Sequence, residues 1–87
     1  MRDIKPTNFL LGSSDINNEK LFCTDLALSK YFRIKGKHVP MTENNPMVGC
    51  ARYASISAHK GIELSRRDDL ESLGYMLVHF IKGRLPW

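Results

Sequence analysis

An acid, a lysine and an amide stand close together near the start of the sequence, at the spacing D-x-K-x-x-N. They are Asp3, Lys5 and Asn8, and a further acid, Asp25, follows later in the chain. A carboxylate and an amide oxygen can share one hard metal ion, so Asn8 and Asp25 are candidate ligands if the fold brings them together. The spacing alone fixes three common residue types, and a polar loop before a strand is the plain alternative. The elements around these residues therefore decide what they can do.

The segment between Asn8 and Asp25 has the composition of a β-hairpin. An apolar run at 9–11 is followed by the turn formers GSSDINNE at 12–19 and by a second strand-like run at 20–24. We therefore expect 9–11 to pair with 20–24 around a long loop. Asn8 then enters the first strand and Asp25 leaves the second, so both lie at the open end of an antiparallel pair whose strands are about 4.8 Å apart.

A helix over 66–82 is the most clearly marked element. Ser65 can cap it, Asp68 is an acid in its first turn, and Gly83 followed by Pro86 supplies the stop signals. Apolar residues spread around much of its C-terminal half, which predicts a helix enclosed in a larger domain. In the chain alone we expect five apolar side chains of this helix to stay uncovered: Leu73, Met76, Leu77, Phe80 and Ile81.

Residues 30–54 show neither a helical nor an alternating period, and Gly, Pro and Asn recur through them. A segment of this kind inside a compact domain is usually functional or mobile, so we expect a loop that lies against another surface. One helix and one antiparallel hairpin together predict the α+β fold class.

Length and composition limit the chain to one small domain. With 87 residues, 43% of them hydrophobic and 25% charged, it resembles a globular protein rather than a collagen or a disordered chain. The apolar stretch 75–81 is too short to span a bilayer, and nothing at the N-terminus resembles a secretory signal. Cys23 and Cys50 form no C-x-x-C, and the three histidines lack zinc-ligand spacing. We therefore expect free thiols and an intracellular protein, in the cytoplasm or the nucleus, without a membrane partner.

The net charge of +4 raises the question of an anionic partner. The basic residues lie apart, and no aromatic residues alternate with them as they do in many nucleic-acid-binding surfaces. A solvated basic face is the first interpretation, phosphate on a ligand or substrate is the second, and nucleic acid is a distant third. We therefore expect no nucleic-acid partner.

Two motifs in the right order resemble the catalytic half of a eukaryotic protein kinase. That family carries H-R-D-x-K-x-x-N in its catalytic loop and, after a hairpin, D-F-G; the matching stretches here are 2–8 and 25–27. Longer stretches resemble the casein kinase I family, and its alpha type most closely: KLFCTDLALSKYF, HVPMTENNPMVGCARYASIS, HKGIELSRRDDLESLGYML and LPW. The resemblance covers nearly the whole chain. It implies that residues 1–87 are a partial protein kinase domain, running from the catalytic loop through a β-hairpin and the activation segment to the central helix of the C-terminal lobe, with the N-terminal lobe absent.

The resemblance also implies a reaction, the transfer of the γ-phosphoryl group of ATP to Ser or Thr of acidic or phosphate-primed proteins, with Mg²⁺ as the metal. Asp3 would accept the proton of the substrate hydroxyl. Lys5 would neutralise charge on the transferring group. Asn8 and Asp25 would hold Mg²⁺ against the phosphates of ATP.

Three further residues receive roles from the same resemblance. Asp69 matches an acid of the central helix that accepts hydrogen bonds from the catalytic-loop backbone; stabilisation of the helix dipole would suit Asp68 and Asp69 equally, and Asp69 is structural in either case. Arg52 matches a residue that recognises phosphate or acidic groups on the substrate, with Lys30 and Arg2 as possible neighbours. For Lys30, an ordinary solvated lysine is an equal alternative.

The sequence departs from the family at several chemical positions. Met1 stands where the family has histidine, D-F-G has become D-L-A at 25–27, and Cys50 replaces a threonine whose hydroxyl reaches toward the catalytic acid. If Ala27 needs a positive φ, it costs about 1 kcal/mol relative to glycine. Ser57 also differs from the asparagine of the family pattern.

The glycine-rich loop, the strand lysine and the helix glutamate that hold ATP in a kinase have no counterpart in these 87 residues. We therefore expect weak or no binding of Mg-ATP and no catalysis by this chain alone, as in a pseudokinase or a truncated copy. The alternative from another class is a non-catalytic interaction module that binds a kinase or its substrates through the loop that resembles an activation segment.

Overall fold

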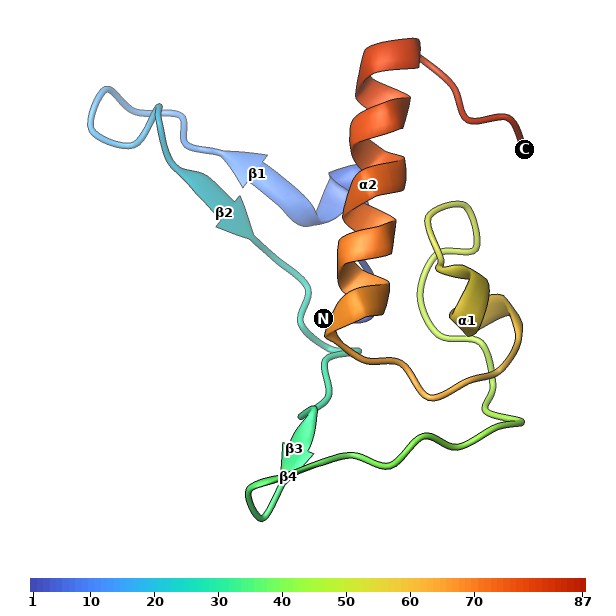
Figure 1. Cartoon of the computed structure of the whole chain (residues 1–87). Coiled ribbons are helices and arrows are strands. Elements are labelled where there is room, and N and C mark those ends of the chain that lie inside the picture. Colours follow the sequence, from blue (N-terminus) through green and yellow to red (C-terminus); the bar gives the residue numbers. More distant parts are fainter.

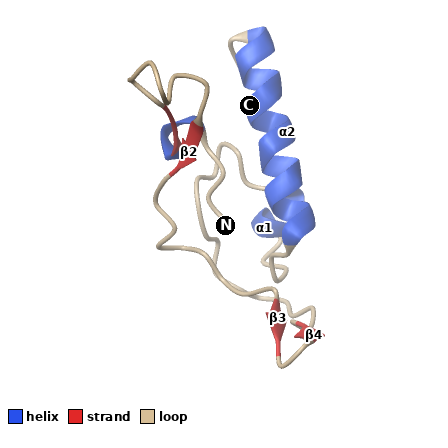
Figure 2. Ribbon diagram, turned by 90° about the vertical axis from the view of Figure 1, so that its left-hand side faces the viewer, coloured by secondary structure: helices blue, strands red, loops and turns tan.

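The computed structural model describes all 87 residues as an α+β arrangement of short antiparallel hairpins and one long helix (Figures 1 and 2). Helix α2 stands between the β1–β2 hairpin on one side and the short helix α1 on the other, and the β3–β4 hairpin projects away from them (Figure 1). The elements in chain order are the 3-10 turn η1 (Pro6–Asn8), β1 (Phe9–Leu11), β2 (Leu21–Cys23), β3 (Arg33–Ile34), β4 (Lys37–His38), α1 (Ile56–His59) and α2 (Arg66–Lys82).

The predicted β1–β2 hairpin is confirmed. Phe9 lies opposite Cys23, and Leu11 lies opposite Leu21. The pairing continues beyond the strands, because the N–H of Thr24 donates to the carbonyl of Asn8 at 2.9 Å. Asn8 and the residue after Thr24, which is Asp25, therefore lie at the same open end, as the sequence predicted.

Helix α2 has the predicted bounds, and local hydrogen bonds at its two ends explain them. At the first turn, the Asp68 carboxylate accepts from the N–H of Ser65 at 2.7 Å, which satisfies one of the donors around the start of the helix. At the other end Gly83 adopts a left-handed conformation with φ 72°, and its N–H donates to the carbonyl of His79 at 2.8 Å. Glycine adopts this conformation without the strain that a side chain would add.

The expectation of a structureless loop over 30–54 is wrong for one part of it. Strands β3 and β4 form a second antiparallel hairpin, and Lys35 and Gly36 between them have φ 51° and 77°. Two left-handed residues in a two-residue turn are the geometry that matches the twist of such strands. Strands of two residues are too short to show an alternating pattern. The one-turn helix α1 was missed for the same reason; Ser55 caps it, since its Oγ accepts from the N–H of Ala58 at 3.0 Å.

The buried core is small and mostly polar. Three buried residues are apolar, Tyr53, Ala58 and Met76, and five are polar: Asp3, Asn8, Ser55, Asp68 and Ser72. The molecule measures 45 × 36 × 17 Å. Its accessible surface of 6677 Å² exceeds the roughly 5,200 Å² typical of a folded monomer of this mass.

The apolar residues of α2 are only partly uncovered. The expectation that Met76 is uncovered is wrong, because the helix packs this side chain against the rest of the chain, where it is 6% exposed. Leu73 is half-buried. Leu77, Phe80 and Ile81 are exposed, as expected. No helix is both long and apolar enough to cross a membrane.

Candidate functional site

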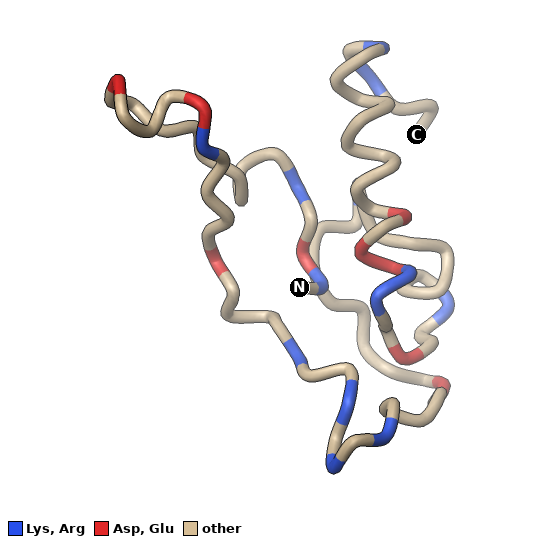
Figure 3. Tube along the Cα trace, turned by 60° about the vertical axis from the view of Figure 1, so that its left-hand side comes forward, with Lys and Arg blue, Asp and Glu red and all other residues tan.

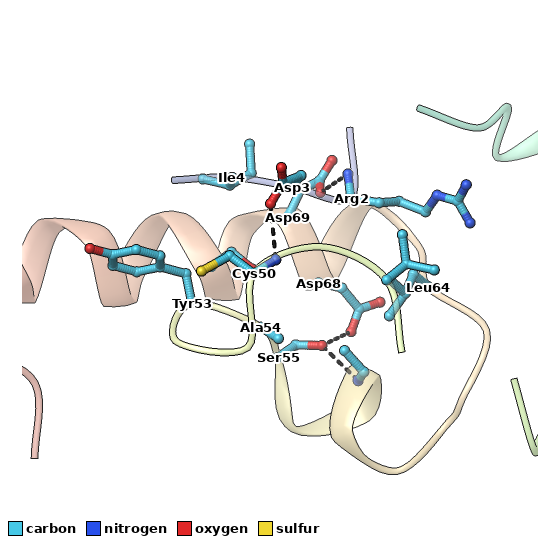
Figure 4. Close-up of a pocket in the computed structure, with 13 residues that line it drawn as sticks. Arg2, Asp3, Ile4, Cys50, Tyr53, Ala54, Ser55, Leu64, Asp68 and Asp69 are labelled. Carbon is cyan, nitrogen blue, oxygen red and sulfur yellow. Dashed lines mark hydrogen bonds between the residues drawn. The ribbon is translucent and has the colours of Figure 1, made fainter. Parts of the chain in front are cut away.

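The first residues of the chain are fastened to α2 by one carboxylate. Asp69 accepts a hydrogen bond from the N–H of Arg2 at 2.8 Å (Figure 4). It accepts a second one from the amino group of Met1 at 2.6 Å. This acid of α2 therefore accepts a hydrogen bond from the backbone of the residue before Asp3. Arg2 itself has a left-handed φ of 69°. The next residue, Asp3, is the acid of the D-x-K-x-x-N motif.

Asp3 is 6% exposed, and three donors converge on its carboxylate. The N–H of Cys50 donates to Oδ1 at 3.0 Å, the Lys5 ammonium lies 2.8 Å from Oδ2, and the Asn8 side-chain amide donates to Oδ2 at 3.2 Å. Figure 4 shows the loop that carries Cys50 lying directly against Asp3. The fold thus brings together Asp3, Lys5 and Asn8, which the motif spacing singled out.

These surroundings keep Asp3 ionised at neutral pH. Burial by itself raises the pKa of the Asp3 carboxyl, but the hydrogen bonds and positive charge from Lys5, with the donors of Cys50 and Asn8, outweigh burial and lower the pKa below 3.8. The pKa of Lys5 is raised above 10.5, chiefly by its hydrogen bond to Asp3. A buried carboxylate that can accept a proton therefore lies beside a fixed positive charge.

The side chain of Asn8 has one defined orientation. Its Nδ2 donates to the carbonyl oxygen of Asp3 at 2.9 Å as well as to the Asp3 carboxylate, and both partners can only accept. The Asn8 Oδ1 accepts no hydrogen bond from the chain. Every fully buried side-chain oxygen or nitrogen has a hydrogen-bond partner, so this oxygen is not fully buried. Asn8 as a whole is only 4% exposed, so Oδ1 keeps a small accessible surface and is the atom of this side chain that remains to act as a ligand.

Asp25 presents a second oxygen ligand at the same end of the β1–β2 hairpin. It is exposed, and its Oδ1 accepts only a long hydrogen bond of 3.4 Å from the N–H of Ala27. Asp25 itself takes the left-handed conformation, with φ 55°, whereas Ala27 has no positive φ. The strain considered for alanine therefore does not arise here, and aspartate tolerates the conformation better than most residues do.

Asn8 and Asp25 are the two residues at this end of the hairpin whose side-chain oxygens could hold a hard metal ion. Mg²⁺ is commonly held by one or two protein oxygens together with substrate phosphates and water, and these two residues supply that number. No cluster of three or more His, Cys, Asp or Glu residues that could hold a metal is present.

The cationic residues expected around the substrate separate into two places. Arg2 and Lys30 line one hollow of about 110 Å³. There Lys30 forms an ion pair of 2.6 Å with Glu63, and the Nε of Arg2 donates to the carbonyl of Leu28 at 2.7 Å. Arg52 lines a different, larger hollow of about 480 Å³. The structure therefore places Lys30 beside Arg2 but does not bring Arg52 to them.

Two contacts of the site escaped sequence reasoning. The Oγ of Ser55 donates to Oδ1 of the buried Asp68 at 2.7 Å, which ties the loop after Cys50 to the first turn of α2 (Figure 4). The sequence identified Asp68 only as a first-turn acid. At Cys50 the backbone N–H, rather than the side chain, holds Asp3, so this hydrogen bond does not depend on whether residue 50 carries a thiol or a hydroxyl.

Gly49 explains how the loop comes so close to Asp3. Its φ is 88°, and a Cβ atom added at this position would overlap the carbonyl oxygen of Arg2. Only glycine allows this approach of two backbones. The loop and the N-terminal segment are therefore in direct backbone contact at the candidate site.

Taken together, the site combines an ionised buried carboxylate, an adjacent ammonium and two oxygen ligands at the end of a hairpin. Such a set can accept a proton from a hydroxyl, neutralise the charge of a phosphate and bind a hard cation. No protein-family model matches the sequence.

Proposed function

We propose that the chain forms the part of a casein kinase I-like serine/threonine protein kinase that runs from the catalytic loop to the central helix of the C-terminal lobe. The observation that carries the proposal is the Asp3 carboxylate, which is buried and held ionised by Lys5, Asn8 and the N–H of Cys50. A kinase requires a carboxylate of this kind to accept the proton of the hydroxyl that attacks ATP.

In this function each residue of the motif has a defined task. Asp3 positions the serine or threonine hydroxyl and accepts its proton. Lys5, whose ammonium lies 2.8 Å from Asp3, balances negative charge where the phosphoryl group passes. Asn8 and Asp25 hold Mg²⁺, which neutralises charge on the phosphates of ATP when it is bound.

The protein substrates of this function carry acidic or phosphorylated residues near the target hydroxyl. Two separate positive positions support this proposal, the hollow with Arg2 and Lys30 and the hollow with Arg52. In the first, the Glu63 carboxylate already pairs with Lys30, so an incoming acidic group must compete with it. Arginine in either place can make charge-assisted hydrogen bonds to phosphate.

In this proposal, the 87 residues alone bind Mg-ATP weakly and transfer no phosphate. Catalysis of phosphoryl transfer depends on positioning and on electrostatic stabilisation in a site that excludes water. Asp25 is exposed and Lys5 is half-buried. Activity therefore requires the glycine-rich loop and the strand lysine from other residues, which cover the nucleotide.

A chimera tests the proposal. Residues 1–87 replace the matching segment of an active casein kinase I-type enzyme, and transfer of radiolabelled phosphate from ATP to casein is measured. We expect transfer by the chimera, and a loss of about a hundredfold or more for Asp3→Asn in it, the range of general-base effects. The matched control Asp15→Asn changes an exposed acid in the β1–β2 loop and should leave the rate unchanged. A folded chimera without transfer, or one that is insensitive to Asp3→Asn, would refute the function.

A further inference from the structure

The β3–β4 hairpin is a basic and exposed part of the chain. Residues 33–38 read RIKGKH, and no acid stands between Asp25 and Glu43. In Figure 3 the Lys and Arg segments follow one another along this hairpin, with no Asp or Glu segment among them. The hairpin projects away from α2 (Figure 1), and all six of its residues are exposed. Its positive charge is therefore available to a partner.

Three cations of the hairpin have no carboxylate partner in the chain: Arg33, Lys35 and Lys37. None of the four ion pairs of the chain involves them. The Arg33 guanidinium lies 5.7 Å from the centre of the Phe32 ring, and this contact supplies no counter-ion. Burial of an unpaired charge is costly. We therefore expect this surface to stay outside the core of any larger domain.

Two basic residues that neighbour the hairpin are paired with acids. The Lys30 ammonium lies 2.6 Å from the Glu63 carboxylate. Arg67 lines a hollow of about 120 Å³ together with His38, and its Nε lies 3.7 Å from the Asp68 carboxylate. These acids reduce the positive field beside the hairpin, so the field is concentrated on the unpaired cations.

A fourth unpaired cation comes from helix α2. The Arg66 guanidinium lies 4.2 Å from the centre of the Phe32 ring, and the His38 ring lies 6.1 Å from that ring. A cation–π contact attracts the guanidinium but leaves its charge without a counter-ion, and Arg66 forms no ion pair. The ring thus holds Arg66 beside the hairpin. We name the four unpaired cations the basic arm: Arg33, Lys35, Lys37 and Arg66.

The cations of the basic arm lie on more than one side of the hairpin. Arg33 lies opposite His38, and Lys37 lies opposite Ile34. Since successive residues of a strand point to opposite faces, Arg33 and Lys37 lie on different faces, and Lys35 is in the turn between them. A flat partner meets one face at a time, whereas a flexible chain can follow the hairpin around its tip.

These features favour an acidic protein segment over other anionic partners. A membrane is flat, and the turn presents Lys35 and Gly36 rather than a large apolar side chain that could insert. Single-stranded nucleic acid is usually bound by stacking of its bases on aromatic rings. Here Arg66 lies over the Phe32 ring, and the open ring beside the hairpin is Tyr31, which is 85% exposed. Carboxylates need no ring and pair directly with arginine and lysine.

We propose that the basic arm binds a flexible segment of another protein that is rich in Asp and Glu. The carboxylates of this segment pair with the four cations on both faces of the hairpin. The surface is distinct from the two hollows of the proposed function, because no residue of the basic arm lines either of them. The proposal goes beyond phosphoryl transfer, since binding depends on this surface alone. It also names a partner for part of the loop that the sequence predicted to lie against another surface.

Binding of designed peptides to the full chain tests the proposal. The probe is a fluorescein-labelled peptide of about 12 residues, about 40 Å when extended, in which glutamate alternates with glycine. A matched peptide carries glutamine in place of glutamate. By fluorescence anisotropy we expect the glutamate peptide to bind at least about tenfold more tightly than the glutamine peptide. This preference should shrink as the salt concentration rises, because the paired groups are exposed.

Two double variants with the same change in net charge locate the binding surface. Lys35→Gln with Lys37→Gln should weaken the glutamate peptide by about tenfold. The control, Lys20→Gln with Lys60→Gln, removes two exposed lysines outside the basic arm and should leave binding nearly unchanged. All four side chains are exposed, so circular dichroism should show the same fold for both variants. Neither ATP nor phosphate transfer enters the measurement, so a failure of the proposed function would leave this result intact.

Four outcomes would overturn the proposal. The first is equal binding of the glutamate and glutamine peptides. The second is an equal loss of affinity in the two double variants, which would mean that only the overall charge matters. The third is tighter binding of a uridine oligonucleotide than of the glutamate peptide, which would assign the basic arm to nucleic acid. The fourth is binding to phosphatidylserine vesicles without binding to the glutamate peptide, which would assign it to a membrane.

Discussion

Residues 1–8 and 48–76 contain all eight buried residues of the chain, whereas residues 9–47 contain none. In the first region, side chains of Asp3, Asp68 and Asp69 join segments that lie far apart in the sequence. In the second region, the two hairpins are held mainly by hydrogen bonds between their own neighbouring strands. The comparison shows that buried polar contacts, rather than a large apolar core, fix the candidate site.

The largest effect should come from removing Asp68. Its buried carboxylate accepts hydrogen bonds from Ser55 and from the N–H of Ser65, and Asp68→Ala leaves those donors without a partner. We expect a loss of about 3 kcal/mol in the free energy of unfolding, measured by urea denaturation. Asp15→Ala, in the exposed region, is the control and should have no measurable effect. A loss below about 1 kcal/mol for Asp68→Ala would show that the polar contacts contribute little.

A smaller effect is expected in the apolar part of the first region. Met76→Ala removes one of three buried apolar side chains and should cost about 2 kcal/mol of unfolding free energy. Its neighbour Leu77 is 49% exposed, and Leu77→Ala should stay within about 0.5 kcal/mol of the parent. Urea denaturation of the two variants measures the difference. Equal losses at both positions would mean that the helix is not packed on one side only.

Acid should weaken the first region through Asp3. The pKa of Asp3 in the folded chain is lower than 3.8, because Lys5, Cys50 and Asn8 outweigh the effect of burial. The stability that this carboxylate contributes is therefore complete above the pKa of the unfolded chain and is lost as the pH falls through the folded pKa. Urea denaturation between about pH 5 and pH 2 should show this loss, and Asp3→Asn should lack it. Identical pH profiles for the two proteins would contradict the assignment.

The smallest effect is expected at the turn of the β3–β4 hairpin. Gly36 has φ 77°, and an added Cβ meets no neighbour, so Gly36→Ala costs only conformational free energy, about 1 kcal/mol, within the hairpin. Chemical-shift changes in NMR spectra should stay within residues 33–38, and global unfolding should be unchanged. Changes that reach Ser55 or Asp68 would show that the two regions are coupled.

The elements that the sequence predicted well are those with strong local signals. The run of turn formers between two apolar runs identified the β1–β2 hairpin, and Ser65 and Gly83 identified the ends of α2. Strands β3 and β4 have two residues each and contain no apolar run, and the four residues of α1 are too few to show a helical period, so these elements were missed.

The candidate site was predictable in part. The spacing of Asp3, Lys5 and Asn8 placed them in one loop, and the structure joins them through one carboxylate. The N–H of Cys50 could not be predicted as a partner, because every residue other than proline carries the same donor. Residue types also did not show that Asp68 binds Ser55, since that contact depends on how two distant segments pack.

The backbone contact between the loop and Asp3 has a consequence for how this site can vary among related sequences. Two adjacent positions should differ sharply in the substitutions that they tolerate. Position 50 contributes only its N–H to Asp3, so Thr, Ser or Ala can replace Cys50 there without loss of that hydrogen bond, and proline cannot. Position 49 must have no side chain, because a Cβ atom there would overlap the carbonyl oxygen of Arg2. Any replacement of Gly49 therefore separates the loop from the N-terminal segment. A substitution at position 50 is therefore poor evidence that a related sequence has lost the function of this site. A substitution of Gly49 is direct evidence of that loss.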